Sequence, residues 1–110
     1  MGILILLMLA GRMNIDVLTQ PKMIELVIGL PDLDARYRWL SVYGCSAAMN
    51  EDNTSFCTGD FERESSQELD MRKQITVIWR DVPPGYVLVT VFAFDGDRKI
   101  LARKTRLVLR

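Results

Sequence analysis

Apolar and polar residues alternate along most of this chain, a period of two that predicts β-strands with one buried face. Residues 86–94 are instead apolar on both faces except at Thr90, which predicts a central strand covered on both sides. No long segment has helical periodicity, so we expect an all-β sandwich. Its expected strands, each bounded by Pro, Gly, Asp or Asn, cover residues 23–30, 37–43, 74–79, 86–94 and 99–109.

Two connections carry more specific signals. Asp95-Gly96-Asp97 predicts a hairpin turn, because Asp-Gly supplies the positive φ angles that such turns need. Within residues 65–73, Ser65 and Glu68 have the spacing of a helix capping box, but the apolar residues Leu69 and Met71 lie only two apart. That spacing does not suit a helix, and we expect a loop there.

The chain opens with an uninterrupted apolar run, I-L-I-L-L-M-L-A, over residues 3–10. A membrane-spanning helix needs about 20 apolar residues, so this run predicts no transmembrane span. A secretory signal, a buried strand, an arm that contacts another subunit, or a chain that starts at Met13 all remain open. We therefore assign residues 1–20 to an N-terminal segment and residues 21–110 to the sandwich. The hypothesis that this N-terminal segment contacts another subunit rests on Ile3, Leu4, Ile5, Leu6 and Leu7.

Cys45 and Cys57 are the only cysteines. Without histidine they cannot complete a four-ligand zinc site, and their spacing is not that of a redox C-x-x-C pair. The interpretation that we favour is a disulfide that closes a polar loop over residues 46–56, with two free thiols as the alternative. A disulfide persists outside the reducing cytosol, so it predicts an extracytoplasmic location: secreted, periplasmic, or on a cell or virion surface.

Val82-Pro83-Pro84-Gly85-Tyr86 and the alternating valines after it resemble a corner and strand of immunoglobulin-like and fibronectin type III-like domains. The resemblance covers residues 72–109 and implies a two-sheet Greek-key sandwich of about seven strands. It also implies that Pro84 and Gly85 form a structural corner, to which the Tyr86 hydroxyl hydrogen-bonds. The two cysteines lie too close in sequence to be the bridge that joins the sheets of antibody domains.

The charged residues are unevenly distributed along the chain. The formal net charge is zero, but residues 51–70 carry −6 and residues 98–110 carry +6. Lys104, Arg106 and Arg110 share one face of the predicted last strand. Opposite patches could join one copy of the chain to the next, or both could be ordinary solvated surface, with residues 51–70 as a solvated loop. The basic residues lack neighbouring aromatic platforms, so we expect no nucleic acid partner.

Histidine is absent, and no nucleophile, phosphate-binding or dinucleotide-binding motif occurs. We therefore expect no catalytic residue, no cofactor and no metal. The predicted function is a non-catalytic structural or interaction module of an extracytoplasmic assembly, such as a surface fibre, a bacteriophage particle or an envelope complex. Its predicted partners are copies of itself or a neighbouring assembly protein. The alternative is a monomeric secreted or periplasmic carbohydrate- or ligand-binding domain, which exposed side chains would indicate at Tyr37, Tyr43, Phe56 and Phe61.

Overall fold

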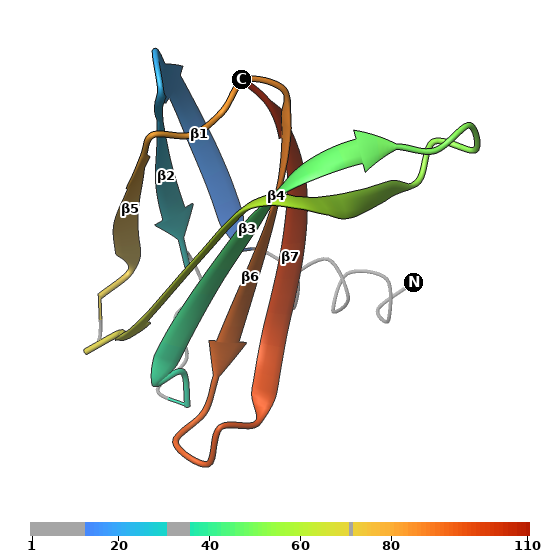
Figure 1. Cartoon of the computed structure of the whole chain (residues 1–110). Coiled ribbons are helices and arrows are strands. Elements are labelled where there is room, and N and C mark those ends of the chain that lie inside the picture. Colours follow the sequence, from blue (N-terminus) through green and yellow to red (C-terminus); the bar gives the residue numbers. More distant parts are fainter. Residues whose placement is uncertain (1–12, 31–35, 71) are drawn as a thin grey trace, which may run out of the picture.

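The computed structural model describes residues 13–30, 36–70 and 72–110, which form seven strands in two packed antiparallel sheets (Figure 1). A three-stranded sheet has the order β1-β2-β5, with β1 at Asn14–Gln20, β2 at Met23–Gly29 and β5 at Gln74–Arg80. A four-stranded sheet has the order β4-β3-β6-β7, with β3 at Trp39–Met49, β4 at Ser55–Glu68, β6 at Tyr86–Phe94 and β7 at Ile100–Leu109. The predicted all-β sandwich is confirmed.

The core lies between the sheets and follows the period of two. In β5 the buried residues Ile75, Val77 and Trp79 alternate with exposed ones. The Trp79 ring lies against Gly44 of β3, where a Cβ atom would come within 2.3 Å of the ring carbon Cζ3. The missing side chain at Gly44 therefore makes room for the largest core residue of the opposite sheet.

The sandwich begins earlier than the predicted boundary at residue 21. β1 pairs with β2 through all seven of its residues, and Ile15 is buried in the core. The two strands are joined at Pro21 and Lys22, and Lys22 has a φ of +62°. Because this turn contains neither glycine nor asparagine, the sequence showed no hairpin signal there.

The predicted loop over residues 51–70 was wrong for most of its length, because β4 occupies Ser55–Glu68. Most of this strand is exposed, with Phe61 as its one buried residue. β4 is an edge strand that hydrogen-bonds to β3. Its order comes from that pairing, which a search for buried alternation does not detect.

The turn after β6 is present as predicted, but its details differ. The residue with positive φ is Arg98, at +63°, and not Gly96. The Asp95 carboxylate accepts hydrogen bonds from the backbone N–H groups of Asp97 and Lys99, at 2.9 and 2.8 Å. A side-chain acceptor, more than the glycine, therefore holds this turn together.

Candidate functional site

The β3–β4 hairpin extends beyond the rest of the four-stranded sheet. β3 pairs with β6 up to Ala47, which lies opposite Tyr86, the first residue of β6. The hairpin continues past that pair to Met49 and returns from Ser55. Figure 1 shows this part pointing away from the three-stranded sheet. We call residues 46–56 the arm, and none of them is buried.

A bulge in β4 bends the hairpin at the base of the arm. Cys45 lies opposite Glu62 and Ala47 lies opposite Cys57, so one residue of β3 faces four residues of β4. Within the bulge Gly59 has a φ of +88°, a left-handed conformation that a residue without a Cβ adopts at little cost. Extra residues in one strand of a pair bend that strand and change its direction.

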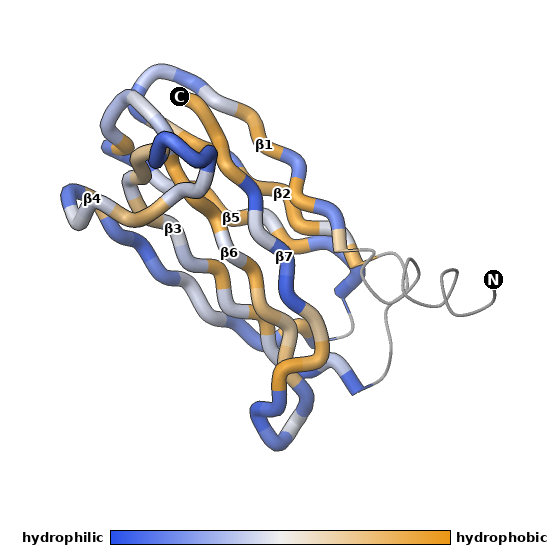
Figure 2. The backbone as a smooth tube through the Cα atoms, turned by 90° about the vertical axis from the view of Figure 1, so that its right-hand side faces the viewer, coloured by the Kyte–Doolittle hydropathy of each residue, from blue (hydrophilic) through white to orange (hydrophobic). Residues whose placement is uncertain are grey.

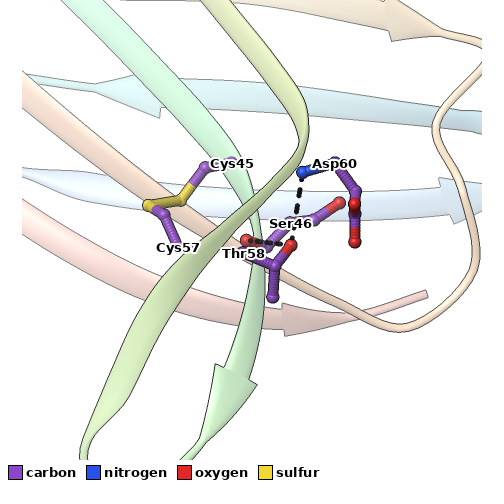
Figure 3. Close-up of a disulfide and its surroundings, with 5 residues drawn as sticks. All are labelled: Cys45, Ser46, Cys57, Thr58 and Asp60. Atoms are coloured by element: carbon purple, nitrogen blue, oxygen red, sulfur yellow. Dashed lines mark hydrogen bonds between the residues drawn. A yellow bond between two sulfur atoms is a disulfide. The ribbon is translucent and has the colours of Figure 1, made fainter.

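A disulfide between Cys45 and Cys57 crosses the bulge (Figure 3). Cys45 is fully buried, Cys57 is exposed, and their Cα atoms are 5.6 Å apart. Beside the disulfide the Thr58 hydroxyl donates a hydrogen bond to the Ser46 carbonyl oxygen at 3.3 Å. The predicted disulfide is confirmed, but it encloses a hairpin and not an open loop. Because it ties both strands together at the bend, it fixes the direction of the arm.

The tip of the arm has its own network of hydrogen bonds. The Asn50 N–H donates to the Thr54 carbonyl oxygen at 2.7 Å, and the Asn50 side-chain amide donates to Thr54 Oγ1 at 2.8 Å. Thr54 Oγ1 in turn donates to the Asp52 carboxylate at 2.6 Å. Hydrogen bonds from the Thr54 hydroxyl and N–H hold the pKa of Asp52 below its ordinary value. The tip is therefore an ordered turn.

The four aromatic residues proposed as indicators of ligand binding have different environments. Phe56 lies on the arm and is 47% exposed, while Phe61 is a buried core residue. Tyr37 packs against the core, and Tyr43 is half-buried on the four-stranded sheet. The structure therefore does not gather the four into one site.

The outer face of the four-stranded sheet, which points away from the other sheet, carries a second group of aromatic residues. Trp39 lies opposite Phe94 across β3 and β6, and the Arg98 guanidinium lies 5.7 Å from the centre of the Trp39 ring. Arg103 has the same distance to the Phe92 ring. A depression of about 290 Å³ opens here, lined by Trp39, Ser41, Glu64, Ser66, Phe94 and Arg98.

Tyr43 lies in the middle of this outer face, opposite Glu64 of β4. Partial burial raises the pKa of the Tyr43 hydroxyl above its ordinary value, and the carboxylates of Glu62 and Glu64 raise it further. The Tyr43 hydroxyl therefore keeps its proton to a higher pH than an ordinary tyrosine.

The predicted self-association residues of the last strand lie on its inner side. Lys104 and Arg106 share the face of the buried Val108, as predicted from their spacing. Arg106 donates a hydrogen bond to the Ile15 carbonyl oxygen of β1. Arg106 therefore links the two sheets, and it remains exposed at the edge of the sandwich, on the opposite side of β7 from the outer face of the four-stranded sheet.

Arg110 belongs to the predicted corner. Its guanidinium donates to the carbonyl oxygens of Pro83, at 3.2 Å, and Gln20, at 3.1 Å. Its backbone exchanges two hydrogen bonds with Gly85, which has a φ of +112°. The Tyr86 side chain is 41% exposed, and no hydrogen bond of its hydroxyl is found among the described residues. The corner formed by Pro84 and Gly85 is thus held by Arg110, and the role of Tyr86 stays a prediction.

The remaining predictions concern the N-terminal segment, a metal site and a membrane span. Ile3, Leu4, Ile5, Leu6 and Leu7 lie outside the described residues. Within the described ranges, no cluster of three or more His, Cys, Asp or Glu side chains could hold a metal ion. No helix in that part of the chain is long and apolar enough to cross a membrane.

Comparison with known proteins adds no family to this picture. No protein-family model matches the chain, and no curated protein matches it.

Proposed function

We propose that the chain is a non-catalytic interaction module of an extracytoplasmic assembly, in which the sandwich is the scaffold and the arm presents a binding surface. The observation that carries the proposal is the disulfide between Cys45 and Cys57 at the bend of the hairpin. A crosslink at the base of a projecting element reduces the entropy that the element loses when a partner binds. A disulfide also persists in oxidising compartments, which supports a location outside the cytosol.

The arm has the composition of a contact surface. Phe56 and Met49 are 47% and 41% exposed, and Glu51 and Asp52 lie at the turn between them. Exposed apolar side chains on an ordered tip gain contact area at low entropic cost when a partner covers them. The side chains of residues 46–56 form no catalytic arrangement. They favour binding.

The strand order supports an immunoglobulin-like or fibronectin type III-like Greek-key fold for the scaffold. The first, second and fifth strands share one sheet, and the third, sixth and seventh share the other. The fourth strand joins the third, in the manner of the extra strand that variable-type domains add to that sheet. Such folds commonly act in display and adhesion, with loops as the contact elements.

Site-specific photo-crosslinking in the native host tests the proposal. A photoreactive phenylalanine analogue replaces Phe56 on the arm, and the control replaces Ile78, which is 45% exposed on the three-stranded sheet. We expect covalent products with a defined protein partner from position 56 and not from position 78. Equal yields from both positions, or none from either, would reject an arm-directed interaction.

A second candidate function is the binding of a small ligand, favoured by the depression beside Trp39. A half-buried indole next to Ser41 and Glu64 combines an apolar platform with hydrogen-bonding groups, which suits a carbohydrate. Titration with a panel of glycans, followed by calorimetry, tests this function. Saturable binding that is lost in Trp39→Ala and kept in Trp79→Phe would support it, and no saturation with any glycan would reject it.

A further inference from the structure

The outer face of the four-stranded sheet carries apolar side chains at both ends of β6 and β7, separated by the pair Thr90 and Thr105 and by Arg103. Neither sheet of the described chain covers this face. Tyr86 and Leu109 are paired neighbours at one end of the face, with exposed fractions of 41% and 65%. Leu88 and Leu107 form the next pair along the same face. Ile100, which is 54% exposed, lies at the opposite end. Exposed apolar side chains that gather on one face of a domain mark a contact with a partner.

We propose that a second copy of this chain covers the face, in a two-fold symmetric dimer whose axis runs parallel to the strands between the facing sheets. The inference rests on the proposed function and adds the identity of the partner. Figure 2 shows the four strands side by side, with β4 and β7 at the two edges.

Charge selects this orientation of the axis. Glu62 and Glu64 are exposed on the acidic edge strand β4, on the outer face, where they lie opposite Cys45 and Tyr43. Arg103 is exposed on the same face of the other edge strand, β7. An axis parallel to the strands lays β4 of one copy over β7 of the other, where Arg103 comes level with Ser66 and lies between Glu64 and Glu68. An in-plane axis across the strands would lay β4 on β4 and oppose like charges.

The size of the face agrees with a dimer in which the arm takes part. The paired region of β3 from Trp39 to Ala47 spans nine residues. That corresponds to about 30 Å along the strands and, with four strands, about 19 Å across them. Two such faces bury about 1,150 Å², close to the lower limit of about 1,200 Å² for specific interfaces. Further area must come from outside the flat sheet.

The arm is placed to supply that area. It leaves the sheet at Ala47, which pairs with Tyr86, and Tyr86 pairs with Leu109. Under the parallel axis, the same end of β7 in the second copy lies beneath the arm. Each arm therefore reaches over Leu109 of the other copy, where the most exposed apolar side chain of the face lies.

Sedimentation of the full, oxidised chain over a range of about 1–200 µM tests the dimer. We expect a concentration-dependent monomer–dimer equilibrium. Leu109→Lys should weaken dimerisation at least about tenfold, since it places a charge in the apolar contact. Ile78→Lys, the same change on an exposed strand position of the other sheet, should leave it unchanged. A chain that stays monomeric, or equal effects of the two variants, would overturn the inference.

A charge reversal tests the direction of the axis. Arg103→Glu should weaken the dimer, and adding Glu64→Arg to it should restore most of the lost affinity, because the pair is exchanged between copies. Neither side chain is buried, so folding of the variants is expected and is checked by circular dichroism. Two variants that are equally weak would reject the parallel axis.

The outcome separates this inference from the proposed function. Cross-links from position 56 to another protein, together with a monomeric chain, would overturn the homodimer and leave the interaction module intact. Dimerisation of purified protein without any cross-link from position 56 in the host would reject the arm's proposed role in the assembly.

Discussion

Removal of the disulfide should cost the protein both stability and the fixed direction of the arm. Cys45 and Cys57 are separated by 12 positions in the sequence. In the chain-entropy treatment, a closed loop of this size restricts the unfolded chain by about 3 kcal/mol. A domain of this length has a total free energy of unfolding of about 5–15 kcal/mol, so the loss is a substantial fraction of it.

The perturbation is the double variant Cys45→Ala and Cys57→Ala, which avoids placing a hydroxyl at the fully buried position 45. Urea unfolding followed by tryptophan fluorescence measures the loss. With an m-value of about 2 kcal/mol per M, the unfolding midpoint should fall by about 1.5 M. The reduced wild-type chain, which keeps both sulfur atoms, separates the crosslink from the packing of the Cys45 side chain.

Amide hydrogen exchange measures the effect on the arm. The Asn50 N–H, bonded to the Thr54 carbonyl oxygen, reports on the arm, and the N–H groups of β2 report on the sandwich. Reduction should accelerate exchange in residues 46–60 well beyond any change in β2, because local opening of the hairpin becomes easier. A midpoint that falls by less than about 0.5 M with unchanged exchange at Asn50 would refute the role of the crosslink.

Three further substitutions test the geometry by urea unfolding. Gly44→Ala should lower the free energy of unfolding by about 1–3 kcal/mol, because its Cβ overlaps the Trp79 ring. Adding Trp79→Phe should recover part of the loss, and additive effects of the two substitutions would contradict that contact. Arg106→Ala should cost about 1–3 kcal/mol because the Ile15 carbonyl oxygen loses its charged donor, and an unchanged midpoint would show that water replaces it. Gly59→Ala should cost about 1–2 kcal/mol through backbone strain alone, since no atom lies within 4 Å of the new Cβ.

The strands that the sequence predicted best are those with one fully buried face. In β5, Ile75, Val77 and Trp79 are all inward, so the alternation is unbroken. β4 has the opposite character, with Phe61 as the one buried residue among its 14 positions. Its order depends on backbone hydrogen bonds to β3, the preceding strand of the same hairpin. The alternation of apolar and polar residues does not reveal such backbone pairing, and this strand was therefore predicted as a loop.

The candidate site was also predicted only in part from the sequence. Two cysteines without a redox or metal motif were enough to predict the disulfide. The disulfide crosses a bend that depends on a bulge of four residues around Gly59. A single glycine in the sequence is not enough to predict such a bulge. The spacing of Lys104 and Arg106 gave their common face correctly. The buried Val108 beside them was the available signal that this face points inward.

The inward direction of Arg106 also bears on the kind of assembly that the chain can form. β4 is acidic and β7 is basic, and both are edge strands, so edge-to-edge pairing of successive copies would generate an open, head-to-tail fibre. Charged side chains that point inward from an edge strand disfavour such strand addition. On β7, Arg106 lies on the inner side of the strand, stays exposed at its edge and is bonded to β1, which ties this edge to the other sheet. The complementary charges are then best satisfied face to face, and we expect closed dimers in preference to fibres.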